Sequence, residues 1–471
     1  MNLHIIEELI NDKNIKPEDI VNSTLDISEK SILLINHNSQ NRLDQLIEEA
    51  LNKKVKKIIT SDICSIQKNE ILKVKNYEEI FNLFLSKISN TYKNKNYFGI
   101  TGTNGKTTSG YYLSQILNSS SLFIGTNENL LFKNITKEKH LTTPKLFNIV
   151  KLLSLKKFQN IEDVVLEVSS HALDQNRLKG IKFKVAGFTN LSQDHLDYHQ
   201  NMENYFQSKL KLFSEDISES YVYIDSEWGQ MIKSSTTLPS FSIGTSKKNN
   251  IYIKKINSRK KSFDLSFDLE GVAYDISVPL SGPESYLNYL LALSMAYISN
   301  VDNLDNLIES SSKLVNPKGR YEIIKYKNNN DIVIDFAHTP ESIHQAINFS
   351  KRNYRSVIII LGAGGDRDKE KRILMGKSAN NADKIIITND NPRNENEEEI
   401  AKDILNGIDL NKDTEIILNR SDAIARGIDN LDKDSVLLIL GKGHETIQEF
   451  KDNLIEFSDQ EEVKKIIMEN L

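Results

Sequence analysis

The residues best suited to chemistry lie in one glycine-containing stretch, Gly102-Thr103-Asn104-Gly105-Lys106-Thr107-Thr108. It follows a short apolar run ending at Ile100 and precedes Ser109–Leu117, whose apolar spacing predicts a helix. Such a loop turns several backbone N–H groups toward one point, and the helix N-terminus adds partial positive charge. Lys106 supplies a full charge for the β and γ phosphates, and Thr107 supplies a hydroxyl for Mg²⁺. The stretch therefore predicts a nucleotide-triphosphate site, although Ile100 occupies the place of the first glycine of the general phosphate-loop pattern.

Polar residues able to bind a metal follow two further apolar runs. Val164-Val165-Leu166 is typical of a buried parallel strand and is followed directly by Glu167, while the run 185–189 leads into a polar stretch that contains His195. Ligands of open α/β sheets bind beyond the carboxyl ends of strands, and Mg²⁺ prefers hard oxygen ligands. We therefore expect Glu167 and His195 to join Thr107 at a metal site. The alternatives are a solvated carboxylate and a structural histidine.

The elements that must position these residues indicate an α/β protein of three domains, at roughly 150 residues each. We expect a small α/β N-terminal domain at residues 1–93, a central P-loop ATPase-type domain at 94–320 and a C-terminal domain at 321–471. Strands and helices alternate in the central range, which favours a mostly parallel sheet. There, Tyr286–Tyr297 is apolar enough to form a core helix, and Asn316-Pro317-Lys318-Gly319-Arg320 is a break signal at the second boundary.

The C-terminal range repeats one pattern four times, an apolar strand followed by a polar loop and usually a helix. The strands are Ile332–Ile334, Val357–Leu361, Lys384–Ile387 and Val436–Leu440. The loops are Asp335–Pro340, Gly362–Asp368, Thr388–Arg393 and Gly441–Glu445. This pattern predicts a Rossmann-like, doubly wound sheet with one decorated edge. Gly362–Gly365 lacks the full dinucleotide fingerprint, so we expect no nicotinamide cofactor.

Composition excludes several classes of protein. The net charge of −5 over 471 residues argues against a general nucleic-acid binder, because affinity for phosphates needs concentrated Lys and Arg. The single cysteine, Cys64, excludes an intramolecular disulfide and a multi-cysteine zinc site. No apolar run approaches the length that spans a bilayer, and the first residues lack the pattern of a signal peptide. We therefore expect a cytoplasmic protein with no nucleic-acid or membrane partner.

Four stretches together resemble the Mur ligases, the ATP-dependent amino-acid ligases of peptidoglycan synthesis. They are Gly102–Thr108, Glu167-Val168-Ser169-Ser170-His171, Asp194-His195-Leu196-Asp197-Tyr198-His199 and Asp335-Phe336-Ala337-His338-Thr339-Pro340. The resemblance is dense from Tyr97 to the end and weak over the first ninety residues. It implies ATP and Mg²⁺, the acceptor UDP-N-acetylmuramoyl-L-alanyl-D-glutamate and the amino acid meso-2,6-diaminopimelate. It also implies an acyl-phosphate intermediate, from which an incoming amine displaces phosphate. We expect the protein to be a monomer.

The same resemblance implies that Lys209 carries CO₂ on its ε-amine and orients a second Mg²⁺. CO₂ reacts only with a neutral amine, whereas a free lysine with a pKa of about 10.4 is mostly protonated, so the site must lower this pKa. Without the resemblance, a simply exposed lysine, like Lys211, is the preferred interpretation. The implied catalytic residues are Lys106, His195 and Lys209, and the implied metal site consists of Thr107, Glu167, His195 and Lys209.

Substrate contacts are also implied. Arg320 and Asp335 resemble the nucleotide contacts that face Gly102–Thr108 across the cleft. The residues that resemble the acceptor contacts are Thr142, Thr143, Ser169, Gln175 and Arg177. Ser23, in Asn22-Ser23-Thr24, is the counterpart of a uridine contact, but this chain lacks the family's Asp-Ser-Arg pattern there.

Asp390-Asn391-Pro392-Arg393 matches the family's recognition motif for meso-diaminopimelate. Diaminopimelate differs from lysine by one distal carboxylate, which a guanidinium can bind in a bidentate pair, and Arg393 is placed for this. Arg367, Gly441 and Glu445 are the remaining implied contacts, with Glu445 suited to the distal ammonium. A polar β-turn explains Asn391-Pro392 but not the arginine.

Three alternatives stay open. A lysine-adding ligase keeps the chemistry, but Arg393 argues against it. A folylpolyglutamate-type synthase also keeps the chemistry, but Thr142-Thr143 and Gln175–Arg177 argue against it. A P-loop ATPase or binding module without ligation would need no UDP-sugar acceptor, and the four decorated strand ends of the last domain argue against that class.

Overall fold

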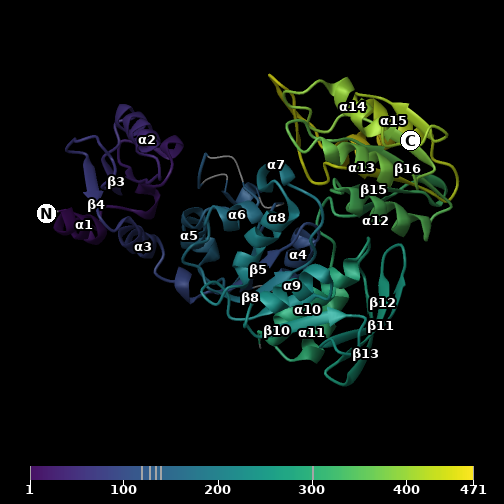
Figure 1. Ribbon diagram of the computed structural model, residues 1–471, viewed down its shortest axis with the longest axis horizontal. Helices are drawn as coiled ribbons and strands as arrows, with labels where there is room; N and C mark the ends of the chain where they lie inside the picture. Colours follow the sequence, from purple (N-terminus) through teal and green to yellow (C-terminus); the bar gives the residue numbers. More distant parts are fainter. Residues whose placement is uncertain are drawn as a thin grey trace. The chain divides into compact units, whose positions relative to one another are not determined.

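The computed structural model describes residues 2–117, 120–126, 129–132, 135–137, 141–299 and 302–469. It divides into two compact units, the first comprising Met1–Tyr97 and Ser119–Lys182 and the second Phe98–Asn118 and Phe183–Leu471. Helices and strands alternate along both units, which confirms the predicted α/β class (Figure 1). The predicted domain limits at residues 93 and 320 stay a prediction.

The first unit contains a small parallel sheet with the order β1-β2-β3-β4. Its strands are β1 (Ile20–Val21), β2 (Ile32–Leu34), β3 (Lys57–Ser61) and β4 (Ile71–Val74), and its helices are α1 (Asn2–Asn11), α2 (Gln40–Asn52) and α3 (Tyr77–Ile88). Leu43 and Ile47 of α2 pack with Ile58 of β3, so the amphipathic face of α2 covers the sheet. The unit also contains the parallel pair β6 (Ser121–Ile124) and β7 (Asp163–Glu167), and α5 (Leu146–Ser154) and α6 (Ser170–Asp174).

The central part of the second unit is a sheet with the order β13-β12-β11-β10-β9-β8-β5. The strands are β5 (Asn96–Thr101), β8 (Phe183–Phe188), β9 (Tyr221–Ile224), β10 (Ser240–Gly244), β11 (Ile251–Ser258), β12 (Phe263–Leu269) and β13 (Val272–Val278). Strands β8 to β11 run parallel, as predicted, whereas β12 and β13 extend the sheet by antiparallel pairing. Helix α10 (Ser285–Ile298) packs against α4 (Lys106–Ile116) and is buried along most of its length, which confirms the predicted core helix.

The C-terminal part is a six-stranded sheet with the order β14-β15-β19-β16-β17-β18. Its strands are β14 (Glu322–Lys325), β15 (Asp331–Asp335), β16 (Ser356–Leu361), β17 (Lys384–Ile387), β18 (Asp413–Ile416) and β19 (Ser435–Leu440). Its helices are α12 (Pro340–Lys351), α13 (Glu370–Ala379), α14 (Glu397–Leu405), α15 (Arg420–Asp429) and α16 (Asp459–Glu469). Adjacent residues such as Ile359 and Ile360 belong to separate cores on the two faces, which confirms the doubly wound domain.

Three details differ from the sequence predictions. Helix α4 begins at Lys106 rather than Ser109, because the turn at Gly105 leads straight into it. The edge strands β14 and β18 were not predicted; their side chains are partly exposed, so they lack a continuous apolar run. After β19 the chain forms the hairpin β20 (Ile447–Glu449) and β21 (Leu454–Glu456) before its last helix.

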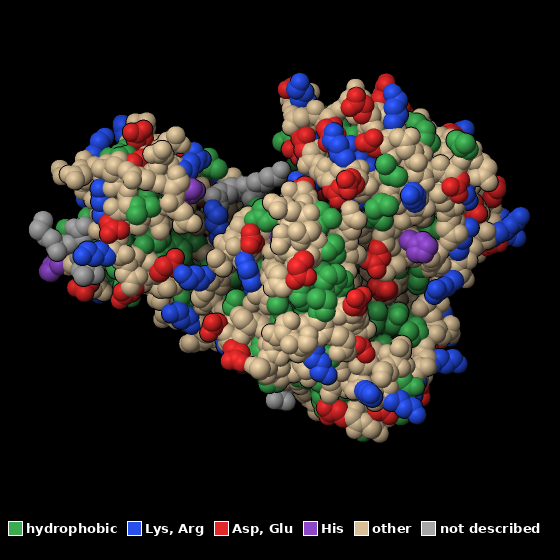
Figure 2. All heavy atoms as spheres, in the orientation of Figure 1, with side chains coloured by type: hydrophobic (Ala, Val, Ile, Leu, Met, Phe, Trp, Pro, Cys, Tyr) green, Lys and Arg blue, Asp and Glu red, His purple; other side chains and the backbone are tan. Residues whose placement is uncertain are grey.

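The described helices include none that is long and apolar enough to cross a membrane. Figure 2 shows Lys and Arg side chains interspersed with Asp and Glu over the visible face.

Candidate active site

The predicted phosphate loop joins β5 to α4, as a strand–loop–helix nucleotide site requires. Gly105 is the N-cap of α4 with φ +84°, a left-handed conformation that favours glycine, and a Cβ there would collide with the side chain of Asn288. The end of β8 fixes the loop, because the Asn104 backbone N–H donates to Asn190 Oδ1 at 2.9 Å and the Thr103 N–H donates to Asn190 O at 2.9 Å. The loop is therefore held in shape by the protein itself.

Two cations lie on this loop. Lys106 Nζ donates to the backbone oxygens of Gly102 at 3.0 Å and Thr103 at 2.8 Å, so its ammonium group is folded over the loop. Arg320 Nη2 donates to Thr107 Oγ1 at 2.9 Å, and its guanidinium lies 4.3 Å from the ring centroid of Phe336. The predicted far-side nucleotide contact thus reaches the phosphate loop.

A pocket opens beside the loop. The loop, the N-terminus of α10 and the C-terminal part all contribute to its lining, which includes Asn104, Thr108, Glu284, Asn288, Arg320 and Phe336. Asp335 also lines it and accepts hydrogen bonds from the backbone N–H groups of Tyr321 at 2.6 Å and Ala337 at 2.8 Å. Burial raises the pKa of Asp335, while the charge of Arg320 opposes this shift. The pocket combines aromatic, cationic and amide groups, which suits a nucleotide.

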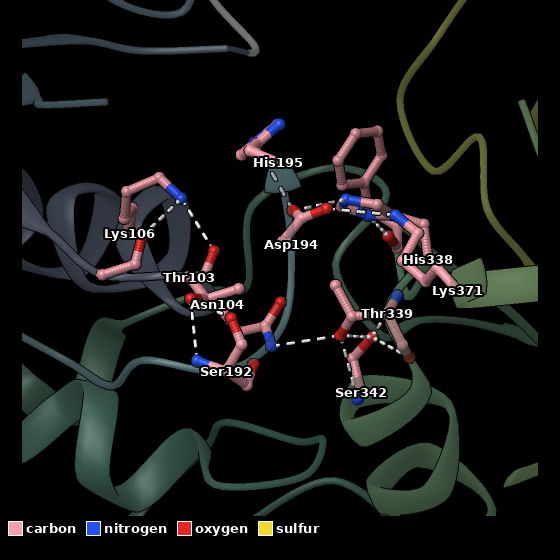
Figure 3. Close-up of polar contacts among 12 residues, drawn as sticks. Thr103, Asn104, Lys106, Ser192, Asp194, His195, His338, Thr339, Ser342 and Lys371 are labelled. Atoms are coloured by element: carbon pink, nitrogen blue, oxygen red, sulfur yellow. Dashed lines mark hydrogen bonds and ion pairs between the residues drawn. The ribbon is translucent and has the colours of Figure 1, made fainter. Parts of the chain in front are cut away.

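Asp194 is the centre of a charged cluster that joins neighbouring His195 to two residues distant in sequence, His338 and Lys371 (Figure 3). Its Oδ1 lies 3.0 Å from Lys371 Nζ, and its Oδ2 lies 3.4 Å from His195 Nε2 and 3.6 Å from His338 Nε2. Burial raises the pKa of the Asp194 carboxyl, but the contact with His338 and the charges of His195 and Lys371 outweigh it and hold the pKa well below its usual range. A second contact joins the same two parts of the unit, because Asn104 Nδ2 donates to Thr339 Oγ1 at 3.2 Å.

Lys209 lies in the last turn of α8 (Met202–Leu210) and is 1% exposed, whereas Lys211 is exposed. The interpretation of Lys209 as a simply exposed lysine is therefore wrong. Its Nζ donates to Gly102 O at 2.8 Å and lies 4.4 Å from the ring centroid of Tyr205. Burial and the charge of Lys106 lower the pKa of Lys209 well below its ordinary value, against the opposing charge of Asp194. This lowering of the pKa is in the direction that carbamylation requires, because only a neutral amine reacts with CO₂.

Most predicted acceptor residues lie together in the first unit. Ser169, the N-cap of α6, donates its backbone N–H to Thr143 Oγ1 at 2.9 Å. Arg177 Nη1 donates to Thr143 O at 3.2 Å, and its Nε and Nη2 donate to Gln175 Oε1 at 2.9 and 2.7 Å. Thr142 Oγ1 lies 3.4 Å from Thr126 Oγ1.

Glu167 adjoins this group, because its Oε2 accepts hydrogen bonds from the backbone N–H of Thr126 at 2.9 Å and from Thr126 Oγ1 at 3.0 Å. Ser23 lies elsewhere in the unit; it is buried and accepts a hydrogen bond from Leu25 N at the start of a short 3₁₀ turn.

The predicted amino-acid residues come together at the carboxyl ends of β17 and β19. Asn391 Nδ2 donates to Glu445 Oε2 at 2.9 Å, so the two predicted loops meet. Buried Lys442, which the sequence analysis missed, holds both residues, since its Nζ lies 3.3 Å from Asn391 Oδ1 and 3.2 Å from Glu445 Oε2. Gly441 begins the second loop, and its N–H donates to Asp335 O at 3.1 Å.

The two arginines predicted to bind diaminopimelate differ in their contacts with the protein. Arg393 Nε donates to Glu449 Oε2 at 3.0 Å, and its Nη1 donates to Gly365 O at 2.6 Å, so the protein already engages this guanidinium. Arg367 is exposed and makes no hydrogen bond or ion pair with the residues that the structure describes. Both side chains lie near Gly364, where a Cβ would be 3.0 Å from Arg393 Nη1 and 3.8 Å from Arg367 Cγ.

Comparison with known proteins gives the family. Residues 100–296 match the Mur ligase middle domain, and residues 319–443 match the Mur ligase glutamate ligase domain. The chain is 34% identical over 486 residues, 98% of each chain, to a protein of Rickettsia conorii named UDP-N-acetylmuramoyl-L-alanyl-D-glutamate–2,6-diaminopimelate ligase. The chain belongs to the Mur ligase family.

Further relatives agree with this assignment. A protein of Aquifex aeolicus with the same name is 38% identical over 380 residues, 79% of this Mur ligase and 77% of the relative. A solved structure of a ligase of that name is 26% identical, covers 96% of this chain and 95% of its own, and has a TM-score of 0.64. MurF of Thermotoga maritima in complex with ADP has the same TM-score at 16% identity and shares the fold.

The side chains near the phosphate loop show whether this Mur ligase could hold the predicted Mg²⁺. The described ranges contain no group of three or more His, Cys, Asp or Glu side chains that could hold a metal ion. The Thr107 hydroxyl lies on the phosphate loop, and Lys209 touches that same loop through Gly102. Mg²⁺ needs few ligands from the protein, because it keeps several waters and binds substrate phosphates. The residues of the second unit therefore fit Mg²⁺ held mainly by a nucleotide.

Proposed function

We propose that this Mur ligase uses ATP to join meso-2,6-diaminopimelate to the D-glutamate of UDP-N-acetylmuramoyl-L-alanyl-D-glutamate, in peptidoglycan precursor synthesis. The observation that carries the proposal is similarity along 98% of the chain to relatives that bear the name of this ligase. We further propose that the protein is a cytoplasmic monomer.

The phosphate loop suits activation of the acceptor. A carboxylate is a poor acylating agent because its leaving group would be oxide, and transfer of the γ-phosphoryl group of ATP to it provides a better one. Lys106 would leave the carbonyls of Gly102 and Thr103 to bind the phosphates. Arg320 would likewise leave the hydroxyl of Thr107 to bind them. Bound Mg²⁺, held by Thr107 and by a carbamate on Lys209, would neutralise charge on the transferring group. His195 is the remaining proposed metal contact in the second unit, and the role of Glu167, which belongs to the first unit, stays a prediction.

Lys209 is suited to become that carbamate. In its neutral form the amine carries a lone pair that can attack CO₂; a C–N bond forms, one N–H proton is lost to water, and the product is a carbamate anion beside Lys106. The role of Asp194 differs, since Lys371 and two histidines already surround its carboxylate. We propose that this cluster holds the C-terminal part closed over the phosphate loop, with the amine of the amino acid near the acyl phosphate.

The amino-acid residues support diaminopimelate over lysine. The distal carboxylate of diaminopimelate would bind the exposed guanidinium of Arg367 and that of Arg393, which would exchange its bond to Gly365 for the ligand. Glu445, beside Asn391, would bind the distal ammonium. Lysine lacks the distal carboxylate that would bind these two arginines.

ADP release by the purified protein tests the proposal. The assay supplies Mg²⁺, ATP and the UDP-muramoyl-dipeptide, with diaminopimelate, L-lysine or no amino acid. We expect ADP to form in equal amount to a UDP-muramoyl-tripeptide, and only with diaminopimelate. A preference for lysine would refute the substrate, and steady ADP release without acceptor would indicate an ATPase instead.

A further inference from the structure

Two buried polar side chains begin the last helix, α16. Asp459 is 0% exposed and Gln460 is 2% exposed, although the predicted site includes neither. Burying a carboxylate or an amide costs free energy unless partners satisfy its hydrogen bonds. The hydrogen bonds of these two side chains, directly or through Arg420, reach the segments that hold the predicted substrate residues.

Asp459 acts through Arg420. Its carboxylate forms a bidentate pair with the Arg420 guanidinium, at 2.7 Å to Nε and 2.8 Å to Nη2, and both side chains are fully buried. Other N–H groups of Arg420 donate to Asn389 O at 3.3 Å and Leu440 O at 3.1 Å. Asn389 and Leu440 directly precede Asp390 and Gly441, the first predicted amino-acid contacts of the two loops, so one buried pair joins both loops.

Gln460 reaches the second of these loops and the ATP contacts. Its Nε2 donates to Gly443 O at 2.9 Å and to Glu322 Oε2 at 3.1 Å. Both partners are acceptors, which fixes the orientation of the amide. Glu322 Oε2 also accepts from the backbone N–H of Gly319 at 2.9 Å, and Gly319 directly precedes Arg320. Gln460 therefore links the amino-acid loop to the segment that carries the nucleotide-facing arginine.

The two linked segments touch each other without intervening side chains. Gly443 has φ +54°, and a Cβ there would lie 2.8 Å from Gly319 O and 2.8 Å from Phe336 Cβ. Because backbone meets backbone, a displacement of one segment cannot be absorbed by a side-chain rotamer and is passed to the other.

We propose that Asp459 and Gln460 are positioning residues: Asp459, through Arg420, holds the two amino-acid loops together, and Gln460 holds the second of these loops and the ATP-facing segment in one fixed relation, so that both substrates depend on the link through Gln460. This inference rests on the proposed function, because it takes the two segments to bind diaminopimelate and ATP. The acceptor residues are predicted in the first unit, so the KM for the acceptor serves as an internal reference.

Steady-state kinetics of full-length variants test this link. Gln460→Met keeps the length of the side chain but removes both N–H donors, and Gln460→Glu turns oxygens toward two acceptors. We expect Gln460→Met to raise the KM for diaminopimelate and the KM for ATP about three- to tenfold each, the scale of one or two lost hydrogen bonds. Gln460→Glu should raise both further, and the KM for the acceptor should stay at its wild-type value.

The matched control is Val463→Ala, one turn further along α16. Val463 is 0% exposed and packs in the apolar core, so its truncation lowers the Tm without touching either segment. If Gln460→Met lowers the Tm as Val463→Ala does and leaves both KM values unchanged, Gln460 only stabilises the fold and the proposal is overturned. A rise in only one KM would also overturn the link.

A wild-type protein that releases no ADP with all substrates present would reject the proposed function instead. Calorimetric titration of ATP into wild type and Gln460→Met then still decides the ATP side of the link. Weaker binding by Gln460→Met would support it, and equal affinities would overturn it.

Discussion

Replacing Lys209 separates its chemical role from its structural one. Lys209→Met keeps the length and apolar stem of a side chain that is 1% exposed, and it removes the amine that would carry CO₂. The lost hydrogen bond to Gly102 O is worth about 1 kcal/mol, and a volume-conserving change in a core costs less than about 1.5 kcal/mol. Lys209→Ala also leaves a cavity and should cost about 2–5 kcal/mol.

Activity should fall far more than stability. Loss of one preorganised charge at a transferring phosphoryl group lowers kcat by roughly 10²–10³-fold, so Lys209→Met should be nearly inactive and still fold. A short carboxylate added to Lys209→Ala should restore part of the activity by replacing the carbamate. Labelled bicarbonate should give a carbamate carbon signal in the NMR spectrum of wild type and not of Lys209→Met. Lys211→Met is the matched control, because Lys211 is exposed two residues further on.

Stability gives an independent check in buffer freed of CO₂. Since the folded pKa of Lys209 lies below the unfolded value of about 10.4, the unfolded chain binds more protons between the two values. The free energy of unfolding of wild type should therefore rise with pH in that window relative to Lys209→Met. Near-normal activity of Lys209→Met, or no carbamate signal in wild type, would refute the reasoning.

Three further predictions concern other charged residues. Arg393→Ala should weaken diaminopimelate binding by about 1.5–3 kcal/mol, and Arg367→Ala by a similar amount; an unchanged KM for diaminopimelate in either variant would show that this arginine serves another purpose. Asp194→Asn should lower the free energy of unfolding by about 1.5–3 kcal/mol near neutral pH. Because the folded pKa of Asp194 is depressed, this difference in the free energy of unfolding should persist above about pH 5 and shrink as the pH falls below the unfolded pKa of about 3.9. Urea unfolding measures it, with the exposed variant Asp197→Asn as the control. A difference that grows as the pH falls would contradict the stabilising role of the charged cluster. Lys442→Met should raise the KM for diaminopimelate several-fold because it withdraws support from Asn391 and Glu445, whereas exposed Lys451→Met should not; equal KM values would show that Lys442 does not position them.

Local sequence patterns predict much of the fold. Continuous apolar runs such as Val357–Leu361 revealed the buried parallel strands, since such strands are covered on both faces. The sequence does not predict strands β14 and β18, because each lies at an edge of its sheet, where half-exposed positions accept charged residues. Apolar spacing predicts the start of α4 at Ser109, three residues late, because this spacing does not show that a helix begins at a glycine turn.

The candidate site was predictable where its residues are neighbours in sequence. The phosphate loop and Asp390–Arg393 are such runs. The burial of Lys209 was not predictable, because Gly102, which accepts its hydrogen bond, lies 107 positions away. Asp194 and Lys371, 177 positions apart, form an ion pair that only the folded chain displays. The engagement of Arg393 by Glu449 likewise depends on the β20–β21 hairpin.

Calorimetric titration of a non-hydrolysable ATP analogue in the presence of Mg²⁺ tests the central claim, that a nucleotide triphosphate binds the loop Gly102–Thr108. We expect one saturable site in the wild-type protein and a large loss of affinity in Lys106→Met. The absence of measurable binding by wild type, or binding that Lys106→Met leaves unchanged, would contradict it.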